Sequence, residues 1–153
     1  MAKAKFQDRE LTIADAVSEA MGEIQSLAEE MREAFDNTPE SLQNDGVGAA
    51  RGEAADNLEN ISEPDVPNEL QDEAFKVKWK VKILSPSAQR RKSRSDRRYE
   101  AVETLNQVVH TLEEIQDDEK LSDEVKNAAT SFIDEVQKVI DEAEAVEFPG
   151  MYG

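Results

Sequence analysis

The sequence lacks cysteine and contains one histidine, His110. The absence of cysteine excludes disulfide bonds, thiolate metal sites and cysteine nucleophiles, and it fits a reducing compartment. A single histidine excludes metal sites that need two histidine ligands. Aromatic residues make up only 5% of the chain, so we expect a thin aliphatic core built from long helices. Nothing in this composition calls for a cofactor, and we predict none.

Long apolar runs are also missing. No stretch approaches the roughly 18 apolar residues of a membrane-spanning helix, and residues 1–8 lack the apolar core of a signal peptide. We therefore predict a cytoplasmic protein that has no membrane partner.

Charge is abundant and unevenly distributed. The net charge is −17, with 35 acidic and 18 basic residues. Ten of the basic residues lie between positions 76 and 98, where Asp96 is the only acid. The chain is thus acidic, then basic, then acidic, and this order indicates that the basic segment has a task of its own.

The N-terminal part predicts two helices. Apolar residues recur at steps of three and four from Ile13 to Phe35, and Thr12 with Asp15 forms a helix start. We expect this helix to end at Asp36-Asn37. Residues 44–48 are predicted as a loop, residues 49–62 as a shorter helix, and the segment after Pro64 as extended chain.

A different period begins at Phe75. Apolar residues alternate with lysines over residues 75–83, which predicts a strand with one lysine face. Further helices are predicted at about 95–117 and 123–146, and the short connection makes them an antiparallel hairpin. The fold class is therefore mainly α, with helical hairpins or a bundle and one short lysine-alternating strand at residues 75–84. We expect one domain over 1–153, with acidic helices at 12–62, an extended and basic segment at 63–98, a helical hairpin at 99–147 and a tail at 148–153.

This strand needs a partner, because unpaired backbone groups are costly. The only internal candidate that we find is a fold-back of Val81–Leu84 on residues 64–67. The strand then either pairs with another chain or lies as an edge strand on its own helices with the lysines outward. The candidate partner-binding residues are Phe75, Lys76, Val77, Lys78, Trp79, Lys80, Val81, Lys82, Arg90, Arg91 and Arg94.

The basic segment at 76–98 allows two interpretations. Lysines and arginines could contact phosphates while Trp79 stacks on a base of a nucleic acid. Alternatively, the segment lies against the acidic helices of its own chain, which we favour because the flanking acids would repel a polyanion. In the reverse role, outward carboxylates of the first helix could imitate DNA: Glu19, Glu23, Glu30 and Glu33.

One pattern suggests an enzyme. Glu29-Glu30-Met31-Arg32-Glu33 is followed, after 19 residues, by Glu53-Ala54-Ala55-Asp56. This resembles the EExxE…ExxD pattern of all-α NTP pyrophosphohydrolases, whose acids hold Mg²⁺ against nucleotide phosphates. The resemblance implies, as an alternative, a metal site formed by Glu30, Glu33, Glu53 and Asp56. Such spacings arise readily in a chain with 35 acids.

Residues 33–61 contain a second resemblance. The stretch Glu33-Ala34-Phe35-Asp36-Asn37-Thr38-Pro39-Glu40-Ser41-Leu42-Gln43, with the Gly-containing gap and the helix after it, is similar to uncharacterised small acidic helical proteins of bacteriophages. It implies a phage origin, and a location in the host cytoplasm or in a virion.

Our leading hypothesis is a non-catalytic acidic interaction protein that binds another protein, with inhibition of a host nucleic-acid-handling factor as one outcome. The alternative outside the enzymes is a homo-oligomeric structural or virion protein. The tail residues Phe148, Met151 and Tyr152 either fold back on the hairpin or serve as a docking peptide.

Overall fold

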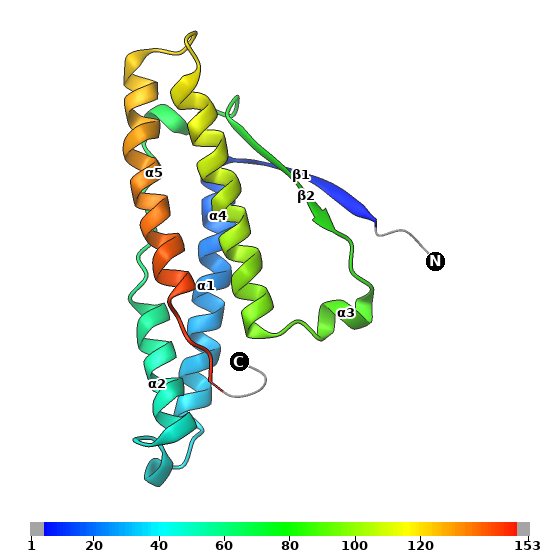
Figure 1. Ribbon diagram of the computed structural model, residues 1–153, viewed down its shortest axis with the longest axis vertical. Coiled ribbons are helices and arrows are strands. Elements are labelled where there is room, and N and C mark those ends of the chain that lie inside the picture. Colours follow the sequence, from blue (N-terminus) through cyan, green and yellow to red (C-terminus); the bar gives the residue numbers. More distant parts are fainter. Residues whose placement is uncertain (1–4, 150–153) are drawn as a thin grey trace.

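The computed structural model describes residues 5–149 and is mainly helical, with one small antiparallel sheet (Figure 1). The long helices lie roughly along one direction, and the sheet crosses them on one side. The elements, in chain order, are β1 (Phe6–Thr12), α1 (Ile13–Asp36), η1 (Glu40–Leu42), α2 (Gly46–Glu59), η2 (Asn68–Leu70), β2 (Lys76–Lys82), α3 (Pro86–Arg90), α4 (Arg94–Asp117) and α5 (Asp123–Glu144).

Helix α1 is the centre of the bundle and packs against both α2 and α4. Its predicted start and end are confirmed: the Thr12 side chain accepts a hydrogen bond from the Asp15 amide, and the last helical residue is Asp36. The apolar spacing places one face of α1 in the core, with Ile13, Met21 and Leu27 fully buried. This helix thereby links the two halves of the chain.

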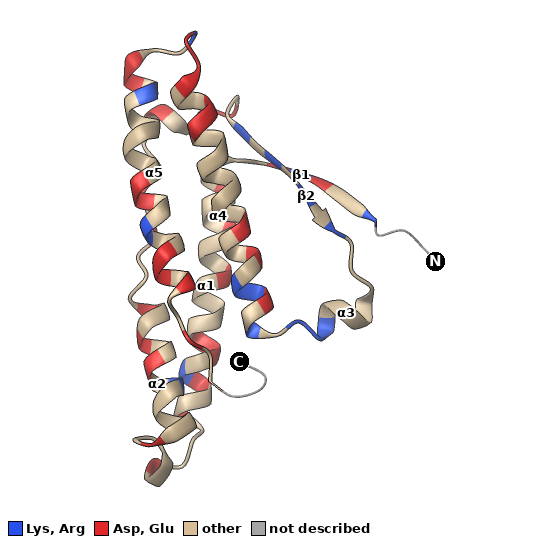
Figure 2. Cartoon of the chain, in the orientation of Figure 1, with Lys and Arg blue, Asp and Glu red and all other residues tan. Residues whose placement is uncertain are grey.

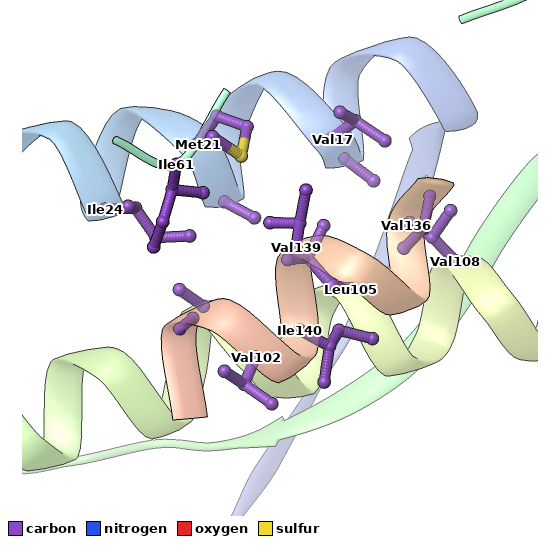
Figure 3. Close-up of a cluster of buried hydrophobic side chains, with 14 of the residues drawn as sticks. Val17, Met21, Ile24, Ile61, Val102, Leu105, Val108, Val136, Val139 and Ile140 are labelled. Atoms are coloured by element: carbon purple, nitrogen blue, oxygen red, sulfur yellow. The ribbon is translucent and has the colours of Figure 1, made fainter. Parts of the chain in front are cut away.

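The predicted C-terminal hairpin is confirmed. Helix α4 begins with a capping box between Ser93 and Asp96, and α5 begins with Ser122 accepting from the Val125 amide. Each cap satisfies amides that the first helical turn leaves without a partner. The two helices pack along their length. Figure 3 shows Val136, Val139 and Ile140 of α5 beside Val102, Leu105 and Val108 of α4, with Val139 pointing toward α1.

Helix α2 starts earlier than expected, at Gly46 instead of residue 49. Gly48, in the predicted loop, and Gly52 after it allow α2 to pack closely on its neighbours. A Cβ atom at Gly48 would lie 2.0 Å from the Leu42 carbonyl oxygen, and one at Gly52 would lie 2.8 Å from the Phe35 ring. The predicted loop is present only at residues 44–45, and its extension to residue 48 was wrong because this packing involves residues outside the segment.

The predicted strand is present as β2, but its expected partner was wrong. Residues 64–67 do not pair with it. Strand β1 does, with Phe6 opposite Lys82 and Thr12 opposite Lys76. This two-stranded sheet lies on α1 and α4, because Val77 and Trp79 face the helices and are buried. Among the helices of residues 5–149, none is long and apolar enough to cross a membrane.

Candidate interaction surface

The sheet has two chemically different faces. The register places Val77, Trp79 and Val81 on the side that packs on the helices. The other side carries four lysines of β2, which we call the lysine face: Lys76, Lys78, Lys80 and Lys82. The alternation of β2 therefore separates a core-forming side from a charged side, as the period-two pattern predicted.

The lysine face has few internal partners. Across the sheet, Asp8 lies opposite Lys80 and Glu10 lies opposite Lys78. The Asp8–Lys80 ion pair is long, at 3.9 Å, and 74% of the Lys80 side chain is exposed. An ion pair of this kind contributes little to stability because water screens it. A cavity of about 420 Å³ is lined by these two pairs of charged residues, Asp8 with Lys80 and Glu10 with Lys78, and by Arg9 and Trp79.

On the inner side, Arg9 joins the sheet to the bundle. Its guanidinium group lies 5.2 Å from the centre of the Trp79 ring, and its Nη2 atom donates a hydrogen bond of 2.8 Å to Glu19 on α1. Trp79 is 8% exposed and is covered by this stack. The side chain that we considered for stacking on a base thus belongs to the core side of the sheet, as does Val77.

Arginines at the start of α4 contact α1. Arg97 donates hydrogen bonds to the carboxylates of Glu23 and Glu30 and to the Ser26 hydroxyl. Burial alone would lower the pKa of Arg97, but the hydrogen bonds to the two carboxylates outweigh it and raise that pKa. The Arg94 Nε atom lies 3.6 Å from the Glu30 Oε1 atom. The predicted docking of basic residues on the chain's own acidic helices is confirmed for these two arginines.

The same contacts correct our view of α1 as a DNA-like row of outward carboxylates. Glu19, Glu23 and Glu30 are engaged by arginines of the same chain, and only Glu33 of the four lacks such a contact among the interactions of residues 5–149. Figure 2 shows further acidic positions on α2, on α5 and along α4, and many of the basic positions on β2 and around the start of α4.

The remaining arginines of the predicted binding set lie around α3. The Arg91 Nε atom donates to the Ser87 carbonyl oxygen, and Arg90 lines a second cavity of about 420 Å³ between α3 and the bundle. Lys92 in this cavity pairs with Glu100. Phe75 is partly buried against the core. The structure thus separates the predicted set into lysines that are exposed except for the half-buried Lys76, apolar residues that are buried or partly buried, and arginines near α3 and α4.

The four acids of the possible magnesium site are not gathered into one group. Glu30 is engaged by Arg97, and Asp56 accepts a hydrogen bond of 2.5 Å from Arg32. Within the described residues, no three Asp, Glu or His side chains are placed to hold one metal ion. Glu33 and Glu53 therefore do not form a cluster with Glu30 and Asp56.

Arg32 joins α1 to α2 through Asp56 and a second carboxylate of α2. It also donates to both oxygens of Glu59, at 3.1 and 2.6 Å. The hydrogen bond from Arg32 is the main cause that lowers the pKa of Glu59, and the hydrogen bonds to Glu59 and Asp56 raise the pKa of Arg32. Positions that resemble metal ligands thus act here as partners of an arginine.

Part of the tail folds back on the hairpin, which is the first of the two alternatives that we gave for it. Arg98 donates to the Val146 carbonyl oxygen, and its guanidinium group lies 5.0 Å from the centre of the Phe148 ring. Phe148 is partly buried against the core. Met151 and Tyr152 lie outside the described residues.

No protein-family model, curated protein or solved structure matches this chain. The resemblance of residues 33–61 to phage proteins therefore stays a prediction, and function has to be inferred from the geometry of the molecule itself.

Proposed function

We propose that this chain is a non-catalytic interaction protein that binds another protein through the lysine face. The observation that carries the proposal is the unequal use of the basic residues. The arginines at the start of α4 are paired with α1, whereas the lysines of β2 project from a sheet that already has its internal partner strand. Four cations in one strand are a poor way to stabilise a fold, and an exposed charged patch favours association with a complementary surface.

The acidic body supports a protein partner over a nucleic acid. With a net charge of −17, the molecule repels polyanions at long range, while a protein can present an acidic segment locally to the lysine face. The resemblance to phage proteins supports a host protein as the partner. Inhibition of a host protein that handles nucleic acids is the outcome that we propose for such binding.

A photoreactive amino acid at Lys82, at the end of β2, tests this function. Full-length protein carrying it is exposed to host lysate and irradiated, and the crosslinked partner is identified by mass spectrometry. We expect one partner from this position and none from the same photoreactive residue at Asn106, which is exposed on α4.

A charge-matched pair of variants makes that experiment specific. Lys78→Gln with Lys80→Gln should lower the crosslinked yield about tenfold, because two cations of the surface are lost. Lys126→Gln with Lys138→Gln removes the same charge from α5 and should leave the yield unchanged. Equal yields from the two variants, or crosslinking mainly from Asn106, would exclude the lysine face as the binding surface.

Self-assembly is the second candidate function, since the open end of the sheet exposes two large apolar side chains. Phe6 is 59% exposed and Ile83 is 51% exposed. If the chain is a structural protein, light scattering should show an oligomer that Phe6→Ser with Ile83→Ser dissociates. A monomer at high concentration would rule this candidate out.

A further inference from the structure

The hydrogen-bond pattern of the sheet shows which backbone groups of β2 are free. The Ile83 amide donates to the Lys5 carbonyl oxygen, and the register continues from this pair along the sheet. In an antiparallel ladder, hydrogen-bonded pairs alternate with pairs whose N–H and C=O groups point away from each other. Val77, Trp79 and Val81 are therefore bonded to β1, and the backbone groups of the four lysines point to the opposite edge.

No other part of the described chain uses that edge. Outside the sheet itself, no hydrogen bond within residues 5–149 involves the backbone of Lys76, Lys78, Lys80 or Lys82. A strand edge with unpaired donors and acceptors is a template for a further strand. The open edge lies on the same four residues that form the lysine face, so an added strand would meet both backbone groups and ammonium groups.

Charge selects what this edge can accept. A second copy of β2 would bring lysines next to lysines, which is unfavourable for directly opposed residues. Strand β1, the internal partner of β2, instead places acidic residues opposite lysines: Asp8 opposite Lys80 and Glu10 opposite Lys78. Lysines on an edge strand also discourage unselective apolar strands. A strand with acidic residues at every second position meets each of these conditions.

We propose that the free edge of β2 binds an extended acidic segment of the partner as a third, antiparallel strand of the sheet. This inference rests on the proposed function and specifies its binding mode. Main-chain hydrogen bonds to the four lysines supply binding, and carboxylates opposite the ammonium groups supply selectivity.

The probe is a short synthetic peptide, as long as β2, that alternates glutamate and valine. Its glutamates would lie on the lysine face and its valines beside Val77, Trp79 and Val81. Binding to the full-length protein is measured by fluorescence anisotropy, and amide hydrogen exchange by NMR. We expect exchange at the amides of Lys78, Lys80 and Lys82 to slow by about tenfold or more, with little change at Val77, Trp79 and Val81, which are already bonded to β1.

Two controls separate strand addition from charge attraction. The same peptide with N-methyl groups on its edge-facing amides keeps every carboxylate but loses these donors, and it should bind at least about tenfold more weakly. A peptide that alternates lysine and valine should not bind. Among protein variants, Lys78→Gln with Lys80→Gln and Lys82→Gln should weaken binding, whereas Lys120→Gln with Lys126→Gln and Lys138→Gln should not.

The outcomes distinguish this inference from the proposed function. If the N-methylated peptide binds equally well, or if the lysine amides gain no protection, strand addition is wrong while a lysine-face partner can stand. If the peptide fails to bind and crosslinking from Lys82 yields no partner, both are wrong. If the lysine amides are already protected in the free protein and light scattering shows an oligomer, the edge is occupied by a second copy and the inference is overturned.

Discussion

Arginines and lysines are used differently in this molecule. Three arginines join different elements of the fold: Arg9 joins β1 to α1, Arg32 joins α1 to α2, and Arg97 joins α4 to α1. The lysines of β2 join almost nothing, because the one ion pair that they form within residues 5–149, Lys80–Asp8, is 3.9 Å long and exposed. Arg9, Arg32 and Arg97 thus hold parts of the fold together, whereas the lysines of β2 leave most of their charge at the surface.

The chemistry of the two side chains accounts for this division. A guanidinium group is planar and presents several donors in fixed directions, so Arg97 can bond two carboxylates and a hydroxyl at once. An ammonium group is compact and strongly hydrated and stays in water more readily. Because arginines and lysines are used differently, the net charge alone does not indicate which surface of this protein can bind a partner. What matters for binding is which cations the fold leaves free.

The largest effect that we expect comes from deleting an internal arginine. Arg97→Met leaves Glu23 and Glu30 without their partner in a partly buried place, and it should lower the free energy of unfolding by about 2 kcal/mol. Lys80→Met should change it by less than about 0.5 kcal/mol, because that side chain is exposed. Urea unfolding followed by circular dichroism measures both. Equal losses would contradict the division between arginines and lysines.

Exchanging the two cations keeps the charge and tests geometry. Arg97→Lys removes the fork that reaches Glu23 and Glu30 together, and we expect a loss of about 1 kcal/mol in the free energy of unfolding. The reverse exchange, Lys80→Arg, should be neutral within about 0.5 kcal/mol because no partner geometry is lost. The same urea titrations compare them. A harmless Arg97→Lys would mean that charge, and not hydrogen-bond geometry, holds α4 on α1.

Helix patterns in the sequence predicted the bundle well. Thr12, Asp15 and the apolar spacing located α1, and Ser122 located the start of α5, because caps and periodicity are local signals. The start of α2 was missed since Gly48 is required by contact with Leu42, outside that helix. Local rules assign such glycines to a loop.

The sequence did not predict strand β1 or the inward position of Trp79, and the reason is again a contact between distant residues. Residues 6–12 show no apolar alternation, because Arg9 occupies an inner position that only becomes favourable by stacking on Trp79 and pairing with Glu19. The one available signal was charge: Asp8 and Glu10 have the spacing that the lysines of β2 require. The lysine face was predicted correctly because it depends only on alternation within β2.

Acid should weaken the arginine contacts selectively. The pKa of Glu59 is held below its ordinary value of 4.5 by Arg32, so its contribution to stability is present above that value and is lost as pH falls through the lower folded-state pKa. Glu59→Gln should therefore cost about 0.5 kcal/mol at neutral pH, a small figure because the pair is largely exposed, and the difference should vanish in acid. Glu113→Gln, exposed on α4, controls for the loss of one negative charge. Urea unfolding of each variant over a pH series gives the difference. A cost for Glu59→Gln that persists in acid would contradict the role of Arg32.

The smallest expected effect concerns the lysine face itself. A double-mutant cycle on Lys80 and Asp8, with alanine at each position, should give a coupling of about 0.2 kcal/mol, because the two charges are exposed and 3.9 Å apart. In 1 M salt this coupling should fall to zero, whereas a cycle on Arg97 and Glu23 should keep a measurable part of its larger value, since partly buried charges are screened less. Denaturant unfolding at low and high salt gives both couplings. A Lys80–Asp8 coupling as large and as resistant to salt as that of Arg97 and Glu23 would mean that the lysines also stabilise the fold. The charge of these lysines would then be used inside the molecule, and the lysine face would not be free to bind a partner.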